Sequence, residues 1–348
     1  MIDALSLRQY LNKWVKADST RDDLANTIQS IANTSVELAK VIANNSFEVF
    51  DNDSVGINAD GDRQKPLDIL AHRLFEDAFR DSAVALLASE ECEEAILLNE
   101  NASLAVAIDP LDGSSNIETN AAVGTIFAIF PAVNDENTTV DANVLQPGVN
   151  QLAAGYCIYG PQTSLILTTG NGTHIFTLDP DEVEFRLTAA NVQIPETTRE
   201  FAINVSNFRH WDRHVRSYID DCLAGEEGHR KSNYNMRWIA SLVAECQRIL
   251  ARGGIFLYPG DARKGYAHGR LRLLYECSPI AFLIEQAGGG ATTGKQRVLE
   301  VVPENIHQRV PMIFGSSREI RRVERYYAER EMHGERSQLF NKRGLFRA

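Results

Sequence analysis

The sequence predicts a mixed α/β fold made of two domains that each contain a sheet. The chain has 348 residues, which is long enough for two domains. Short apolar runs separated by turn residues follow one another between residues 124 and 188, a pattern typical of an antiparallel meander. The second half alternates strand-like and helix-like segments, as mixed sheet domains do. We therefore expect an N-terminal domain over 1–190, a C-terminal domain over 191–330 and a charged tail over 331–348.

Two helices are expected before the first strand. Residues 19–45 carry apolar side chains at helical spacing, Ser19 or Thr20 can cap the start, and Asp22 and Asp23 suit the positive end of the helix dipole. Residues 51–65 are polar and contain glycine, so we expect a loop that can close over a site. The next helix, over 67–79, follows Pro66, which a first helical turn tolerates.

Two successive apolar runs end in pairs of carboxylates. The run over 83–89 is followed by Glu90 and Glu91, and the run over 104–108 is followed by Asp109 and Asp112. Either pair alone is common in a surface turn, but two strands that both end in paired acids favour a site for several metal ions. Hard oxygen ligands select Mg²⁺ or Mn²⁺ rather than zinc or copper. The segment that follows Asp112, residues 113–115, can present backbone N–H groups to an anion.

The remaining elements are read in the same way. Further strands are expected over 124–130, 153–160, 164–170, 173–179 and 184–188, with a loop over 131–148. The second half contains expected strands at 201–205, at 255–259 and near Val298 and Met312, and expected helices over 211–223, over 237–250 and after Ser316. Glu276 follows the apolar residues 273–275 and is therefore a further acid at the end of a core segment.

Composition excludes several classes of function. The net charge of −12 argues against a nucleic-acid partner, because the phosphates would be repelled. No apolar run approaches the ~20 residues that span a bilayer, and the N-terminal residues lack a signal-peptide core, so we expect a cytoplasmic protein without a membrane partner. The five cysteines are scattered without CxxC spacing and are expected to be reduced core residues.

With these motifs, the chain resembles class I fructose-1,6-bisphosphatase, within the wider lithium-sensitive sugar and inositol phosphatase superfamily. The matching motifs are GD at 61–62, LD at 67–68, SEE at 89–91, DPLDGSSN at 109–116, GGIFLYP at 253–259 and RLRLLYE at 270–276. DPLDGS is shared with inositol monophosphatases, whereas SEE, GGIFLYP and RLRLLYE together indicate the bisphosphatase branch. The resemblance implies a layered αβαβα sugar-phosphatase fold, with metal-binding and regulatory features in the first domain and substrate binding in the second.

The resemblance also implies a role for each motif residue. Two or three Mg²⁺ ions, which Mn²⁺ can replace, would be held by Glu90, Asp109, the Leu111 carbonyl, Asp112 and Glu276. Asp68 and Glu91 would orient and deprotonate the attacking water, with Asp62 reaching in from the closing loop. The substrate's 1-phosphate would lie on Asp112, Gly113, Ser114 and Ser115, and its 6-phosphate on Asn207, Arg237, Tyr258 and Arg270.

The 6-phosphate pocket departs from the family at three positions. Position 270 is Arg rather than Lys, which keeps the charge but changes the geometry. Trp238 and His210 stand where better-known members have tyrosines, and Trp supplies only an N–H donor. Without the family, Arg237 would be interpreted as a helix-surface cation. In the family the matching arginine reaches across from a neighbouring subunit, so a homo-oligomer, with a tetramer as the family's arrangement, is expected.

The activity implied is Mg²⁺-dependent hydrolysis of fructose 1,6-bisphosphate in gluconeogenesis or carbon fixation. The alternatives are a sedoheptulose-1,7-bisphosphatase or dual-specificity enzyme, an inositol-phosphate or nucleotide 3′-phosphatase, and a non-catalytic sugar-phosphate sensor. AMP inhibits look-alikes through a site at the start of the N-terminal helix. Here that turn contains Asp22 and Asp23, and the other contact positions are Ser103, Leu104 and Pro131, so we predict that AMP does not inhibit.

Overall fold

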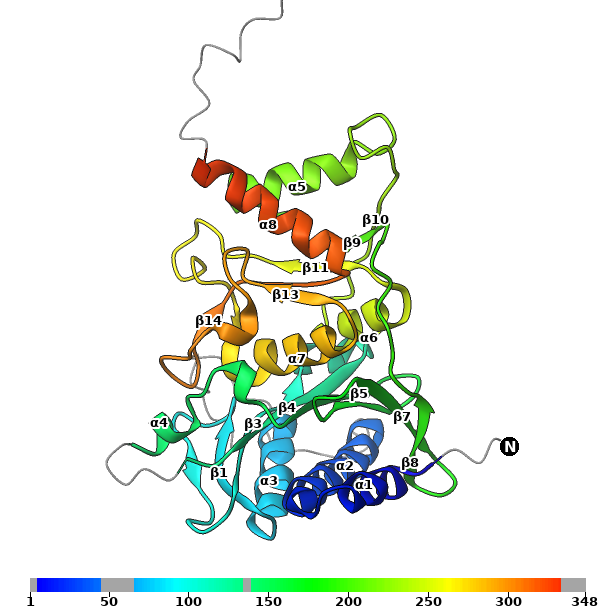
Figure 1. The fold of residues 1–348 in the computed structure, drawn as a ribbon, viewed down its shortest axis with the longest axis vertical. Coiled ribbons are helices and arrows are strands. Elements are labelled where there is room, and N and C mark those ends of the chain that lie inside the picture. The colour runs from blue at the N-terminus through cyan, green and yellow to red at the C-terminus, as the bar shows by residue number, and fades with distance from the viewer. Residues whose placement is uncertain (1–4, 45–65, 134–138, 333–348) are drawn as a thin grey trace, which may run out of the picture.

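The computed structural model describes residues 5–44, 66–133 and 139–332, and its elements are stacked in five layers. Figure 1 shows helices α1 to α3 under a first sheet, helices α6 and α7 between this sheet and a second one, and helices α5 and α8 on the far side. The expected mixed α/β fold with αβαβα layering and two sheets is confirmed. The segment 51–65, and Asp62 with it, lies outside the described residues.

The first layer contains three helices rather than the two expected. The additional helix, α1 (Leu7–Lys16), begins with a capping box in which Ser6 and Gln9 satisfy each other's backbone N–H groups. Helix α2 (Asp22–Asn44) follows a 3₁₀ turn whose cap is Asp18, so the expected caps Ser19 and Thr20 are wrong. Helix α3 (Pro66–Arg80) begins at the proline, as predicted.

The first sheet has eight strands in the order β2-β1-β3-β4-β5-β6-β7-β8. Strands β1 and β3 are parallel, whereas the pairs from β3 to β8 are antiparallel, which confirms the predicted meander. Both faces are covered, because Phe127 packs toward α1–α3 while its neighbour Ile126 packs toward α6 and α7. The strands are β1 (Val84–Ser89), β2 (Ile96–Leu97), β3 (Leu104–Asp112), β4 (Val123–Pro131), β5 (Ala153–Tyr159), β6 (Ser164–Thr168), β7 (Thr173–Asp179) and β8 (Glu184–Ala189).

The second sheet has five strands in the order β10-β9-β11-β15-β13. Its strands are β9 (Glu200–Ala202), β10 (Asn235–Met236), β11 (Ile255–Tyr258), β13 (Gly290–Thr292) and β15 (Met312–Gly315); β12 (Leu271–Arg272) and β14 (Arg309–Val310) form a separate pair. The helices of this half are α5 (Arg213–Leu223), α6 (Leu242–Arg252), α7 (Ser278–Gln286) and α8 (Ser317–Met332). A short helix, α4 (Val140–Val144), lies in the segment predicted as a loop.

Two predicted elements of the second half are wrong. The helix predicted over 237–250 begins only at Leu242, because Arg237 continues the extended chain through an N–H bond to the Phe201 carbonyl (2.7 Å) and Ser241 caps the helix. The strand predicted near Val298 is a 3₁₀ turn.

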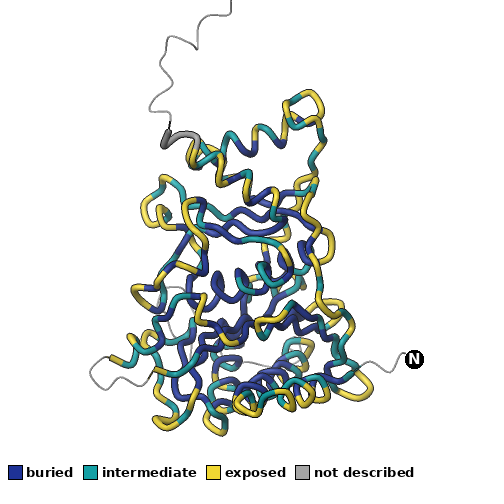
Figure 2. The backbone as a smooth tube through the Cα atoms, in the orientation of Figure 1, coloured by how far each residue is buried: buried dark blue, intermediate teal, exposed yellow. Residues whose placement is uncertain are grey.

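Burial follows the layers (Figure 2), with the sheets and the helices between them darkest. All five cysteines are free thiols, and four of them are buried. Within the described part of the chain, no helix combines the length and the apolar character that crossing a membrane requires.

Candidate active site

The two acidic turns predicted from the sequence meet at one edge of the first sheet. Strands β1 and β3 are parallel neighbours, with Ser89 opposite Ile108, so their carboxyl ends lie side by side. The N–H of Glu90 donates to the Ile108 carbonyl (3.1 Å) and fixes the first acidic turn to the strand that carries the second. This arrangement follows from the sheet itself, because the carboxyl ends of parallel strands share an edge.

A bulge in β3 turns Asp109 and Asp112 toward the same side. Asp109 is opposite Ile126 and Asp112 is opposite Gly124, so the two residues between them have no regular place in the ladder. The Leu111 N–H donates to Asp109 Oδ1 (3.0 Å), and the Thr125 hydroxyl donates to the Pro110 carbonyl (2.8 Å). The bulge is therefore held by its own turn and by the neighbouring strand.

Helix α6 begins against Asp112. The N–H of Val243, in the first turn of α6, donates to Asp112 Oδ2 (3.3 Å), and Ser241 caps the same helix. The close approach requires a glycine on β4, because a Cβ on Gly124 would lie 2.8 Å from the Val243 methyl groups. Asp112 thus receives a helix N-terminus from the other half of the chain.

Glu276 completes the acidic group. It lies on a π-helical turn, Leu273–Cys277, and accepts the backbone N–H of Arg272. Ligand atoms of Asp109, Asp112 and Glu276 all lie within 4.8 Å of one another, and the three residues are buried. Residues separated by more than 160 positions in the sequence therefore form one cluster, which we call the acidic cluster.

Burial disfavours the charged forms of these carboxyls. It raises the pKa of Asp112 to about 6, although the N–H groups of Val243 and Leu242 oppose the change. Burial, together with the charge of Asp112, raises the pKa of Glu276 to about 7, against opposing effects of the Arg272 N–H and of the charges of Arg272 and Arg309. Burial also raises the pKa of Asp109 and of Glu90, and the pKa of each rises further because the neighbouring acids repel its charge.

The acidic cluster fits a hard divalent cation. Asp109 Oδ2 is buried and has no hydrogen-bond partner among the described residues, which is costly unless a cation binds there. The donors are carboxylate oxygens, the ligands that Mg²⁺ and Mn²⁺ prefer. Glu90 adjoins the cluster, since the charges of Glu276 and Asp112 act on it.

Two of the candidate catalytic residues, Asp68 and Glu91, lie on elements that meet at this edge. Asp68 is buried in the first turn of α3. One helical turn later, His72 places Nδ1 3.0 Å from the Ser89 hydroxyl, next to Glu90. Residues four apart share one helix face, so Asp68 lies on the face that meets the acidic turn. Glu91 lies in that turn and is half-buried.

The predicted anion cradle follows β3 directly. Gly113 has φ +74°, a left-handed conformation that favours glycine, and the 3₁₀ turn Ser114–Thr119 begins after it. The Asn116 amide donates to the Ala240 carbonyl (2.8 Å), which ties this turn to the segment before α6. Ser114 is half-buried and Ser115 is exposed.

A cationic and aromatic group lies near the cluster on the second half of the chain. The Arg270 guanidinium is 4.9 Å from the Tyr266 ring centre and 6.0 Å from that of Tyr258. Burial raises the pKa of Tyr258, the charge of Arg270 lowers it and that of Glu276 raises it, so both charges act on this tyrosine. Trp238 stacks on Phe256 (5.8 Å between ring centres) and is 6.0 Å from Tyr258.

Three other residues singled out in the sequence also lie in the second half of the chain. Asn207 is half-buried in the 3₁₀ turn Val205–His210. Arg237 follows β10 on extended chain, half-exposed and 3.4 Å from a Glu200 oxygen, so the helix-surface interpretation is wrong. His210 lines a cavity of about 540 Å³ together with Asp261, Lys295 and Arg309, and none of Tyr258, Trp238 and Arg270 lines that cavity.

Sequence reasoning missed several groups that hold the site. The Val243 N–H, the Ser89 hydroxyl and the side chains of His72 and His307 all contact the acidic turns or Asp112. The only local signal for them is Ser241, which can cap a helix at the position where α6 begins. The other contacts depend on tertiary structure.

The chain is similar to known proteins over nearly its whole length. Residues 7–190 match the family model of the fructose-1,6-bisphosphatase N-terminal domain, and residues 194–328 match that of its C-terminal domain. A class 1 fructose-1,6-bisphosphatase of Rhizobium meliloti is 53% identical, and the match covers 96% of this chain and 96% of that protein. A class 1 fructose-1,6-bisphosphatase of Sinorhizobium medicae is 52% identical, and the match covers 95% of each chain. A crystal structure of Leishmania major fructose-1,6-bisphosphatase in holo form has a TM-score of 0.84 at 33% identity and covers 94% of this chain and 99% of that one.

Proposed function

Because the chain belongs to the class I fructose-1,6-bisphosphatase family, we propose that it hydrolyses the 1-phosphate of fructose 1,6-bisphosphate to give fructose 6-phosphate and inorganic phosphate. The observation that carries the proposal is the acidic cluster of Asp109, Asp112 and Glu276. Phosphate monoester hydrolysis needs charge neutralisation, an activated water and a stabilised leaving oxygen, and a carboxylate cluster provides these when it holds cations. The pathway served is gluconeogenesis or carbon fixation.

The residues fit a site for two or three Mg²⁺ ions, with Mn²⁺ as a substitute. Glu90, Asp109, the Leu111 carbonyl, Asp112 and Glu276 would hold the ions. When bound, such ions neutralise phosphate oxygens, lower the pKa of a bound water and stabilise the leaving alkoxide. The buried, unpartnered Oδ2 of Asp109 supports this assignment.

The chain's own groups would position the reactants. Asp68 and Glu91 would orient the attacking water and accept its proton, with Asp62 as a further acid from the undescribed segment. Asp112, Gly113, Ser114 and Ser115 would bind the scissile phosphate. Gly113 supports this role, because its left-handed conformation turns the chain directly after Asp112.

The second phosphate would lie on Tyr258, Arg270 and Asn207, with Arg237 from a neighbouring subunit. The Arg270 side chain is exposed above two aromatic rings, so it can pair with a phosphate without first breaking a buried ion pair. This pocket distinguishes the leading proposal from an inositol or nucleotide phosphatase, which has no use for a second phosphate site. A sedoheptulose-1,7-bisphosphatase or dual-specificity enzyme is the main alternative, because Trp238 offers a single donor beside Tyr258.

Phosphate release tests the substrate directly. The purified chain is supplied with Mg²⁺ and, in parallel, fructose 1,6-bisphosphate, sedoheptulose 1,7-bisphosphate or inositol 1-phosphate. We expect the highest kcat/KM with fructose 1,6-bisphosphate, and preferential hydrolysis of inositol 1-phosphate would overturn the proposal. Arg270→Ala should raise KM for the bisphosphates, whereas the control Arg252→Ala, at an exposed position in the last turn of α6, should not.

We further propose that the chain is a homo-oligomer, with a tetramer as the arrangement. Arg237 supports this proposal, because its half-exposed guanidinium is available to a partner. Light scattering at working enzyme concentration should give a mass above the 38.7 kDa monomer. Mixing Arg237→Ala subunits with Asp109→Asn subunits should restore part of the activity, and the absence of both results would contradict a shared site.

We also propose that the chain divides into a metal-binding domain over 1–190, a substrate-binding domain over 191–330 and a tail over 331–348. We propose a cytoplasmic location as well. Limited proteolysis tests the domain boundary, because cleavage between 190 and 200 should release two resistant fragments.

A further inference from the structure

The acidic turn after β1 is closed by its own hydrogen bonds. The Ser89 hydroxyl accepts the N–H of Glu91 (3.3 Å), and the Ser89 carbonyl accepts the N–H of Cys92 (3.3 Å). The hydroxyl is fully buried. Two histidines from distant parts of the chain contact this turn, and neither is used by the mechanism described above.

The first histidine is His72 on α3. Its Nδ1 is 3.0 Å from Ser89 Oγ, and its Nε2 is 3.3 Å from a Glu76 carboxylate oxygen and 3.4 Å from the Cys92 sulfur. The Glu76 carboxylate can only accept, so the ring proton resides on Nε2 and Nδ1 accepts from the Ser89 hydroxyl. The series carboxylate, imidazole and hydroxyl is similar to a hydrolase triad, but the buried hydroxyl supports Glu91 and has no access to a substrate.

The second histidine is His307, which follows 215 positions after Cys92. Its Nε2 lies 2.8 Å from the Cys92 carbonyl, and its Nδ1 lies 2.9 Å from the Tyr275 hydroxyl. A carbonyl can only accept, so Nε2 carries the proton and Nδ1 accepts from Tyr275. Tyr275 is fully buried and immediately precedes Glu276, so His307 connects the turn that carries Glu90 to the turn that carries Glu276.

We propose that His72 and His307 are positioning residues that hold the Glu90–Glu91 turn in register with Glu276 and thereby set the affinity of the site for its divalent cation. This inference rests on the proposed function, because it takes these carboxylates to be metal ligands. Neither imidazole touches the reacting atoms; both act through backbone and hydroxyl groups of the turn.

The physical reason is the mutual repulsion of the acids. Without a cation, the charges of Glu276, Glu91 and Asp112 act against that of Glu90, so the turn would relax away from β3 and Glu276 if it were free to move. If the turn is already fixed from two sides, less free energy is lost in ordering it when the cation binds. Groups that orient ligands in this way typically change metal affinity 10–100-fold when they are removed.

Mn²⁺ binding to the substrate-free protein tests the inference without turnover. Electron paramagnetic resonance measures free Mn²⁺ in titrations of His72→Leu, His72→Asn, His307→Leu and His307→Gln. We expect binding about 10–100-fold weaker in the two Leu variants. Asn keeps an acceptor for Ser89 and Gln keeps a donor for Cys92, so both should recover part of the affinity.

His174→Leu is the matched control. His174 is also buried, but it accepts the Asn191 N–H (3.3 Å) and packs on Tyr10 (5.2 Å between ring centres), away from the acidic turn. Its replacement should leave Mn²⁺ affinity unchanged even if the melting temperature falls. Melting temperatures measured for every variant separate loss of stability from loss of affinity.

The outcomes separate this inference from the proposed function. Wild-type protein that fails to bind Mn²⁺, or Asp109→Asn that binds it equally well, refutes the metal site itself. Wild-type affinity in both Leu variants overturns the positioning role while leaving the metal site intact. If His307→Leu does not fold, Tyr275→Phe removes only the hydroxyl that donates to His307, and an affinity equal to that of the wild type would overturn the role of His307.

Discussion

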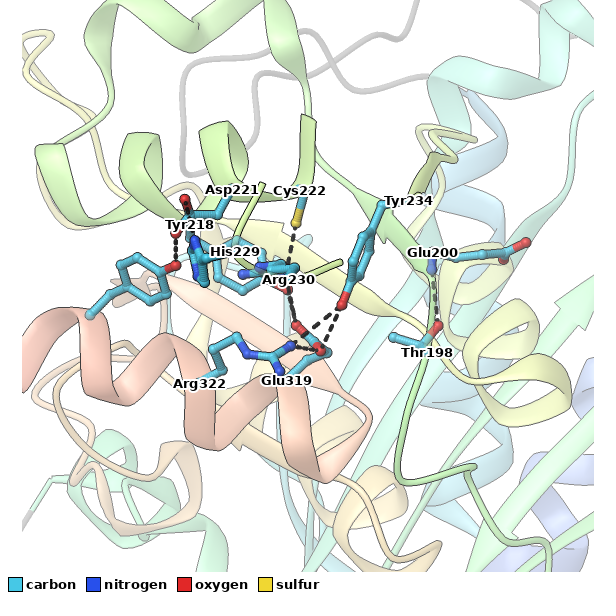
Figure 3. Close-up of polar contacts among 11 residues, drawn as sticks. Thr198, Glu200, Tyr218, Asp221, Cys222, His229, Arg230, Tyr234, Glu319 and Arg322 are labelled. Carbon is cyan, nitrogen blue, oxygen red and sulfur yellow. Dashed lines mark hydrogen bonds and ion pairs between the residues drawn. The ribbon is translucent and has the colours of Figure 1, made fainter. Parts of the chain in front are cut away.

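Two buried acidic sites in this molecule, one a single carboxylate and the other a cluster, have opposite surroundings. Glu319, on α8, accepts the Tyr218 hydroxyl (2.6 Å), the Tyr234 hydroxyl (3.4 Å) and the guanidinium of Arg230 (3.3 Å), and it also pairs with Arg322. Figure 3 shows these donors converging on the one carboxylate. In the acidic cluster, by contrast, Asp109, Asp112 and Glu276 face one another and receive backbone N–H groups.

The difference indicates which group contributes to stability and which to function. A buried charge is tolerated when the chain supplies its partners, as Arg230, only 1% exposed, does for Glu319. In the acidic cluster, burial raises the pKa of Asp112 to about 6 and that of Glu276 to about 7, so the charged form of each is disfavoured and Glu276 is only partly ionised at neutral pH. A bound cation would stabilise the charged forms of the acidic cluster, whereas Glu319 already has cationic partners within the chain.

The largest effect is expected from Asp109→Asn. The variant removes a charge from the cluster and should fold at least as stably as the wild type without metal, yet lose nearly all turnover. Steady-state phosphate release with saturating Mg²⁺ measures the loss. A variant that keeps more than a tenth of the wild-type kcat would show that the metal-site assignment is wrong.

Glu319→Ala should have the opposite effect, lowering stability while leaving turnover unchanged. It leaves Arg230 buried without its carboxylate, which should lower the free energy of unfolding by about 3–5 kcal/mol. Urea unfolding measures this change, and Glu324→Ala, at an exposed position of the same helix, is the control. The kcat of the folded fraction should be unchanged, and a loss of kcat without a loss of stability would contradict the comparison.

The stability of the metal-free protein should fall as pH rises. An acid whose pKa is raised by folding binds more protons in the folded chain than in the unfolded chain between the two pKa values. The free energy of unfolding should therefore decrease by several kcal/mol from about pH 4 to about pH 8. Urea titrations in EDTA at several pH values measure the slope. Saturating Mg²⁺ should flatten it; an equal slope with and without Mg²⁺ would refute the link to the cluster.

AMP is expected to have no effect on the activity. A cavity of about 380 Å³ at the start of α2 is lined by Asp18, Asp23, Arg21 and Ser103. Asp23 accepts the Ser103 hydroxyl (2.5 Å), and the charge of Arg21 is shared with Asp18 (3.5 Å). The two acids should repel a phosphate, and each charge-assisted contact that is missing weakens binding by roughly 1.5–3 kcal/mol.

A dose–response at saturating Mg²⁺ decides the question. Half-inhibition by micromolar AMP would show that this interpretation of the cavity is mistaken. Asp23→Ser provides a sharper version, since a gain of AMP sensitivity there would identify the carboxylate as the group that excludes the nucleotide.

Local patterns predicted most of the fold and the acidic motifs. The apolar runs predicted over 83–89, 104–108 and 124–130 became strands because both faces of the first sheet are covered, so no charged residue interrupts them. Helix α1 was missed although its capping box, Ser6 and Gln9, is visible in the sequence. The family membership was predicted correctly from six short motifs.

Contacts between distant segments could not be predicted. Val243 and Asp112 are 131 positions apart, and the local sequence around neither residue indicates that a helix begins against the bulge in β3. The start of α6 was placed too early because residues 237–241 resemble a helix by composition, whereas the hydrogen bond from Arg237 to β9 and the Ser241 cap place the first helical residue at Leu242. The role proposed for Arg237 involves a second subunit, and the structure contains a single chain.

The meeting of Asp112 with the first turn of α6 constrains the order of events during synthesis on the ribosome. The first sheet can form its ladder as soon as β8 has emerged, but the N–H of Val243 and the carboxylate of Glu276 emerge later. Until then, Asp109 and Asp112 remain open to water at the sheet edge, which is cheaper than burial without partners. The nascent chain therefore completes the acidic cluster only after the whole first sheet has emerged.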